Sequence, residues 1–214
     1  MRGSPLYNQF PTRLTIDGKE YEIRPSWDRV LEAYDTRSDT GLPYSAIVRH
    51  ICSLLFWEQP KDTARAAFEV FRFLEGERDQ SETSDEPRYF DFKQDAKYIY
   101  GAFWQTYGIR LSEWRDTRTK PSEQTRWMHW HEFLYLFASL PEDTRISWIM
   151  GIRSADIPAR NEHNGDTVDR MIRQKAAFRL EVSEDDGAER FAKGAKALFD
   201  KLEAQARSDR KKRS

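Results

Sequence analysis

The 214-residue chain has almost no cysteine and no long apolar run. Its one cysteine, Cys52, cannot form a disulfide within the chain, and its apolar surroundings (IVRHICSLLFW) predict a buried thiol. No apolar stretch approaches the ~18 residues that span a bilayer, and the first residues lack an apolar signal core. We therefore expect a cytoplasmic protein that needs no disulfide.

An excess of charge of one sign is also missing. The 35 Lys and Arg residues and the 36 Asp and Glu residues give a formal net charge of -1. Proteins built to bind duplex nucleic acid usually carry a basic excess, so nucleic acid is not an expected partner. The basic end of the chain, residues 207–214, would give only weak, salt-sensitive contacts with phosphates.

The sequence contains neither a GxxxxGK[ST] phosphate loop nor a G-x-G-x-x-G dinucleotide fingerprint. His131-Glu132 begins a zincin-like pattern, but Tyr135 stands where that pattern needs its second histidine. His129 and His131 are two positions apart, and such residues point to different faces of a helix. We expect hydrogen bonding at the edge of an aromatic layer from these histidines, and no metal site.

Two carboxylate pairs could serve general acid–base chemistry, namely Asp91 with Asp95 and Glu142 with Asp143. Both pairs stand at predicted helix starts, where acidic side chains offset the helix dipole. That structural role accounts for them, so the sequence predicts no catalytic residue, no cofactor and no enzymatic activity.

Aromatic residues are abundant, with 14% of the chain and seven tryptophans, and most of them fall within residues 89–153. Tryptophan, tyrosine and arginine are favoured at binding hot spots. Trp104 lies off the apolar stripe of its predicted helix, Trp114 falls in a polar connection, and Trp148 lies outside the apolar side of its helix. We predict that these three bind a partner. The alternative is that they pack against the hairpin or the C-terminal helices.

The one β signal lies at residues 12–23, where apolar and polar residues alternate around Asp17-Gly18, a pair typical of a type I′ hairpin turn. Helical spacing of apolar residues dominates the rest. The first predicted helix begins at Ser26, the second runs over 45–57, and the third runs from Asp62 or Thr63 to Gly76. Further helices run from Asp91 to Gly108, from Ser122 or Gln124 to Leu140, from Pro141 to Gly151, over 159–182 and over 184–207.

These patterns predict a mainly α fold, a helical bundle with one small N-terminal β-hairpin and a helical C-terminal extension. We expect three parts: a disordered lead at 1–11, a helical core domain with the hairpin at 12–157, and a helical extension with a basic tail at 158–214. Residues 77–88 are polar without periodicity, which predicts an exposed loop.

Several dispersed motifs, in order, resemble a known family. They are IDGKEYEI at 16–23, FDFKQDAKYIYGAFWQTYGIRL at 90–111, MHWHEFLYLFASLPEDTRISWIMGIRS at 128–154, and Asp156-Ile157. Residues 12–157 resemble the phage "gene fifteen" family, which is encoded in tail-gene clusters of siphophages and prophages. The connection at 112–126 is longer than the family pattern, and residues 158–214 match it only loosely.

The resemblance implies a tail assembly chaperone in the host cytoplasm. Such a protein coats the tape-measure protein, recruits tail-tube subunits during long-tail assembly and then leaves. Self-association is left open, and no membrane partner is expected. Two alternatives remain: a structural or adaptor protein retained in the phage tail, and a weak nucleic-acid-binding or regulatory module that uses the basic C-terminal tail.

Overall fold

The computed structural model describes residues 9–39, 41–75 and 89–181. This part of the chain is mainly α, with one two-stranded antiparallel hairpin, which confirms the predicted fold class. Its elements are β1 (Arg13–Ile16), β2 (Lys19–Glu22), α1 (Trp27–Arg37), α2 (Tyr44–Leu55), α3 (Thr63–Glu75), α4 (Ala96–Tyr107), the 3-10 turn η1 (Leu111–Trp114), α5 (Trp130–Ala138), α6 (Arg145–Ser154) and α7 (Gly165–Ala177).

The described chain forms two compact units. The first contains residues 9–75 and 115–131, and the second contains residues 89–114 and 132–181. The predicted core domain, 12–157, includes parts of both. The predicted loop at 77–88, the helix at 184–207, the basic tail and most of the lead lie outside the described residues.

The hairpin forms as predicted. Leu14 pairs with Tyr21 in the antiparallel register. Asp17 and Gly18 both have positive φ, 51° and 77°, as a type I′ turn requires. A lone hairpin is at best marginally stable in water, so its apolar face must be covered. Tyr21 meets Phe56 edge to face at 5.9 Å, which seats the hairpin beside the end of α2.

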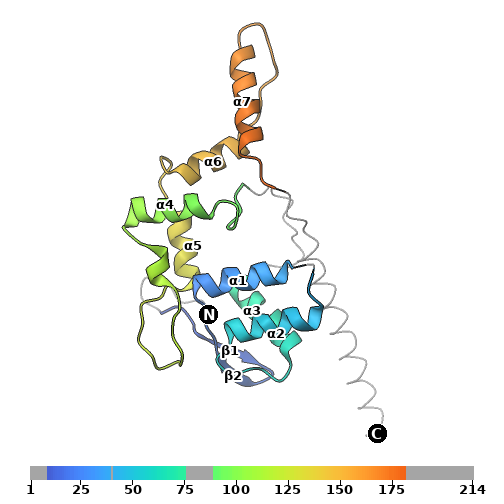
Figure 1. Ribbon diagram of the computed structural model, residues 1–214, viewed down its shortest axis with the longest axis vertical. Coiled ribbons are helices and arrows are strands. Elements are labelled where there is room, and N and C mark those ends of the chain that lie inside the picture. The colour runs from blue at the N-terminus through green and yellow to red at the C-terminus, as the bar shows by residue number, and fades with distance from the viewer. Residues whose placement is uncertain (1–8, 40, 76–88, 182–214) are drawn as a thin grey trace. The chain divides into compact units, whose positions relative to one another are not determined.

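Three helices build the rest of the first unit. α1 packs against α2, α2 packs against α3, and α3 also contacts β1 (Figure 1). Asp62 caps α3 as predicted, because its carboxylate accepts the backbone N–H of Arg65 at 3.0 Å. Cys52 is fully buried on α2, as predicted, and burial raises the pKa of its thiol to about 12.

The predicted helix start at Ser122 or Gln124 is wrong. Residues 124–129 have no helical structure, and α5 begins only at Trp130. The backbone there pairs with a distant segment instead: Trp27 N–H donates to the Met128 carbonyl at 3.2 Å, and Trp130 N–H donates to the Pro25 carbonyl at 2.7 Å. Helical spacing alone predicted the helix, and these long-range backbone bonds override it.

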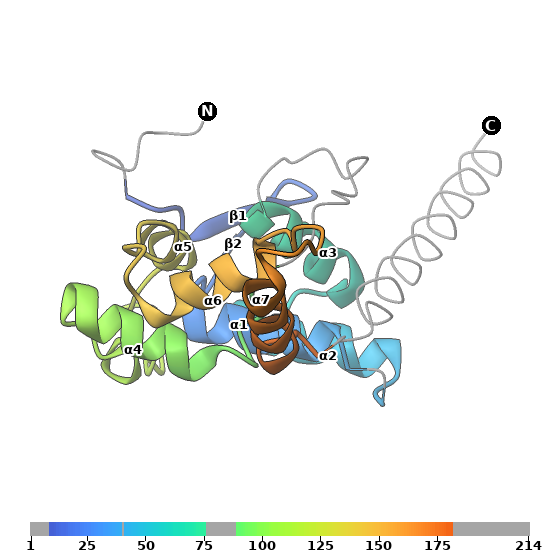
Figure 2. The same ribbon diagram turned by 90° about the horizontal axis from the view of Figure 1, so that it is seen from above.

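The second unit is built on α4 and α6, which lie side by side, with α7 following α6 (Figure 2). Gly108 ends α4 with φ of 67°, the left-handed conformation that suits glycine at this position, as predicted. Phe103 of α4 stacks on Phe133 of α5 at 5.1 Å, and both rings are fully buried. No helix in the described chain has the length and apolar character of a membrane span.

Two predicted helix starts in this unit lie too early. Asp91 does not cap α4. Its carboxylate accepts the N–H groups of Lys93 and Gln94 in a turn that precedes the helix. α6 likewise begins at Arg145 rather than Pro141, with Thr144 as a cap that accepts the Ser147 N–H. In both places a local side-chain bond closes a turn before the helix. The predicted helix over 159–182 is shorter and spans only α7.

Asp95 and Arg153 form the buried centre of the second unit. The guanidinium pairs with the carboxylate through two nitrogens, at 2.5 and 2.9 Å, and the side chains are 1% and 7% exposed. Arg153 also donates to the carbonyls of Tyr89 at 2.9 Å and Phe178 at 2.6 Å. One side chain therefore joins the start of α4, the end of α6 and the end of α7.

Replacing Arg153 by glutamine should lower the free energy of unfolding by about 3–5 kcal/mol, because the Asp95 carboxylate would stay buried without its partner. Arg145→Gln, on the exposed side of the same helix, should cost less than about 1 kcal/mol. Adding Asp95→Asn to Arg153→Gln should recover part of the loss. Chemical denaturation measures all three, and equal costs for the two arginine variants would contradict the assignment.

Candidate partner-binding surface

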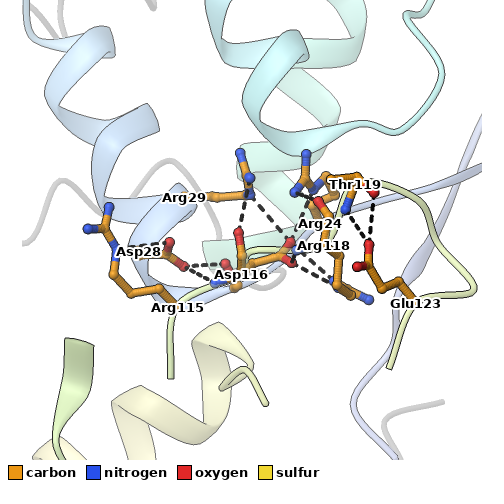
Figure 3. Close-up of polar contacts among 9 residues, drawn as sticks. Arg24, Asp28, Arg29, Arg115, Asp116, Arg118, Thr119 and Glu123 are labelled. Atoms are coloured by element: carbon orange, nitrogen blue, oxygen red, sulfur yellow. Dashed lines mark hydrogen bonds and ion pairs between the residues drawn. The ribbon is translucent and has the colours of Figure 1, made fainter. Parts of the chain in front are cut away.

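The connection before α5 is fixed by a cluster of charges, defined here as the Asp116 cluster (Arg24, Arg29, Asp116 and Arg118; Figure 3). The Asp116 carboxylate is fully buried. It accepts Arg24 Nε at 3.1 Å and two nitrogens of Arg118 at 2.9 and 3.2 Å. Burial alone would raise the pKa of Asp116, but the bonds from Arg118 and Arg24 outweigh it and hold that pKa below its usual value.

Indole rings support the arginines of this cluster. The Arg24 guanidinium lies 4.1 Å from the ring centroid of Trp57, and that of Arg118 lies 4.2 Å from the centroid of Trp127. Three guanidiniums surround one ionised carboxylate that solvent does not reach, so Asp116 is unsuited to act as a general base. The Asp116 cluster fixes residues 115–119 to the first unit.

The two histidines that suggested metal make a stack instead. His129 is buried, its Nε2 lies 3.1 Å from the Pro11 carbonyl oxygen, and its Nδ1 accepts the His131 N–H at 3.1 Å. Phe10 stacks on the His129 ring at 4.8 Å. Because Nδ1 accepts a bond, the proton of the neutral ring must sit on Nε2. The part of the chain described by the structure holds no group of side chains able to bind a metal ion.

The first predicted binding residue, Trp104, is 49% exposed on α4. Tyr100 lies one turn earlier on the same face and is also exposed. The Arg110 guanidinium lies 4.7 Å from the Trp104 ring centroid, and the Tyr100 hydroxyl bonds to Ser112 Oγ at 3.1 Å. We call Tyr100, Trp104 and Arg110 the α4–η1 surface.

The second predicted residue, Trp148, is 39% exposed on α6. The Arg145 guanidinium lies 4.1 Å from its ring centroid, and Phe178 meets the indole edge to face at 5.4 Å. The packing of Trp148 on Phe178 partly fits the alternative that this residue packs against C-terminal structure. The third predicted residue, Trp114, is half-buried at the end of η1.

No ring contact in the described chain joins Trp104, Trp114 and Trp148 to one another. The structure places Trp104 and Trp114 on neighbouring elements, α4 and η1, and Trp148 on α6. Their arginine neighbours were not predicted from the sequence. The spacing of Arg145 and Trp148, three apart on one helix, was a signal that could have been read.

A comparison with protein families matches residues 6–180 of the chain to the model described as "Bacteriophage Gp15 protein". The chain belongs to this family. No curated protein and no solved structure matches it. The Gp15 match confirms the resemblance seen in the motifs and reaches beyond residue 157 to the end of α7. Membership identifies a phage protein.

In this Gp15-family chain, Asp116→Asn should lower the free energy of unfolding by about 3 kcal/mol or more, because three guanidiniums would lose their only buried carboxylate. Asp169→Asn is the matched control. It removes an exposed pair with Arg160 and should cost less than about 1 kcal/mol. Urea denaturation of both variants checks this, and a stable Asp116→Asn protein would contradict the role of the cluster.

The stability of the Gp15-family chain should also fall as the pH is lowered. Burial lowers the pKa of His129 to about 4, whereas an unfolded histidine titrates near about 6.5. The unfolded chain therefore binds more protons between these values, and stability should drop by about 2 kcal/mol from about pH 7 to about pH 5.

This pH dependence can be assigned by comparing two variants in denaturation experiments at both pH values. His129→Phe should lose most of the pH-dependent part. His163→Gln, at an exposed histidine, should keep it. The same pH dependence in the His129→Phe protein would contradict the assignment.

Proposed function

We propose that this chain is a phage tail assembly chaperone that binds the tape-measure protein and helps to recruit tail-tube subunits in the host cytoplasm. The family match supports a phage protein, and the more specific role is the one implied by the motif resemblance. The role needs an exposed aromatic surface for amphipathic helices and no catalytic centre. We accordingly propose no enzymatic activity.

The observation that carries the proposal is the α4–η1 surface. A tryptophan half exposed to solvent is unusual in a chain that buries most of its large apolar side chains. Trp104 and Tyr100 offer two rings on one helix face, one turn apart, which matches the spacing of anchor residues on an amphipathic partner helix. Trp114 on η1 and Trp148 on α6 are proposed as further contacts.

The test is co-expression with the tape-measure protein of the same phage, followed by co-purification. The chain should keep the tape-measure protein soluble, and replacing Trp104, Trp114 and Trp148 together by alanine should reduce the co-purified amount by about tenfold or more. The unfolding temperature should change little. Tyr135→Ala, an exposed aromatic on α5, is the matched control and should bind normally.

Two results would contradict the proposal. One is a tape-measure protein that stays equally insoluble with and without the chain. The other is a stoichiometric amount of the chain in purified virions by mass spectrometry, which would favour the structural or adaptor role. If the triple variant lost stability and binding together, the tryptophans would be packing residues rather than partner contacts.

A further inference from the structure

The C-terminal half of α7 exposes an apolar ridge. Val168, Ile172 and Ala176 follow one another at intervals of four and so lie in one row along the helix. Val168 is buried, at 4% exposure, but Ile172 is 47% exposed and Ala176 is exposed too. Within the described chain, the exposed part of the row therefore begins at Ile172.

This ridge leads into an open depression of about 440 Å³. Its lining residues are Arg153, Lys175, Ala176, Arg179 and Leu180. The lining is held in place, because Arg153 donates to the Phe178 carbonyl and the Gln94 side chain bonds to the backbone of residues 179 and 181. The end of α7 thus presents a fixed surface with apolar residues between cations.

The cations of this surface are largely uncompensated. Residues 170–181 carry four cations against one carboxylate, that of Glu181. Arg153 is neutralised by Asp95, but among the described residues neither Arg173 nor Arg179 has an ion-pair partner. Lys175 Nζ donates to the Arg153 carbonyl, an uncharged acceptor, at 3.1 Å. In the first half of the helix, Asp169 already pairs with Arg160.

We propose that the exposed part of the α7 ridge (Ile172 and Ala176), together with Leu180 just after the helix and with Arg173, Lys175 and Arg179 beside them, binds an acidic amphipathic segment of a partner protein. An apolar row flanked by unpaired cations is complementary to an apolar helix face flanked by carboxylates. Nucleic acid fits less well, because the chain has a formal net charge of -1 and exposes Ile172 where a phosphate would lie. This surface is separate from the α4–η1 surface and does not depend on the chaperone role.

The probe is a labelled synthetic helical peptide with leucine at i, i+3, i+4 and i+7 and glutamate on both flanks, and its binding to the full chain is measured by fluorescence anisotropy. The chain should bind this peptide and should not bind the same peptide with lysine in place of glutamate. Arg173→Glu with Arg179→Glu should weaken binding by about tenfold or more. Ile172→Ala should weaken it by about threefold or more.

The matched control is Arg49→Glu with Lys61→Glu, which changes the net charge equally at two exposed residues of the first unit. It should leave peptide affinity within about twofold, and circular dichroism should show both double variants folded. Equal weakening by the two double variants, or no binding of the acidic peptide by the folded chain, would overturn the proposal.

Other occupants give distinct results. Tighter binding of a single-stranded oligonucleotide or of phosphatidylserine vesicles, lost in Arg173→Glu with Arg179→Glu, would assign the ridge to nucleic acid or to membrane and overturn the proposal. Self-association in sedimentation experiments that the same variant abolishes would assign it to a second copy of the chain and would also overturn it.

Discussion

The Arg153 guanidinium, at the end of α6, bonds to one carboxylate and two backbone carbonyls that come from two other parts of the second unit, the segment before α4 and the end of α7. A buried guanidinium is tolerated only where acceptors meet its donors, so these segments must keep their positions together. The end of α7 is one of them, through the Phe178 carbonyl. The buried contacts of Arg153 therefore also fix the position of the exposed surface at the end of α7.

The first unit also depends on a buried contact between arginine and carboxylate, but the numbers of the two groups are reversed. There a single carboxylate, Asp116, engages three arginines rather than one arginine engaging several acceptors. Arginine suits both sites, because its planar fork can pair with a carboxylate through two nitrogens and can stack on indole rings. Lysine, a compact charge with no planar face, would satisfy neither arrangement. Both units therefore place polar contacts, and not only apolar packing, at positions where distant segments meet.

The sequence predicted well those features that nearby residues determine. The type I′ turn at Asp17-Gly18, the cap at Asp62 and the stop at Gly108 each depend on one or two residues and their neighbours. The exposure of Trp104 and Trp148 also followed from helical spacing, which places a residue on or off an apolar stripe.

Features set by distant partners could not be predicted in this way. Nothing near residues 124–129 indicates that their backbone will pair with residues 25–27, and the Asp116 cluster joins side chains about ninety positions apart. Arg153 lies in one of the motifs that resemble the family. For its partner Asp95, the sequence predicted only the role of an acidic residue at a helix start. The sequence contains no local signal for a contact between the two.

The arginine stacks on the exposed tryptophans have a consequence for binding rates. An indole in water normally samples several rotamers, and holding it in one upon binding costs conformational entropy. Arg110 against Trp104 and Arg145 against Trp148 restrict those rotamers before any partner arrives. A partner would then meet rings that are already oriented. Such preorganisation lengthens the lifetime of a complex, since less disorder is regained when the complex dissociates.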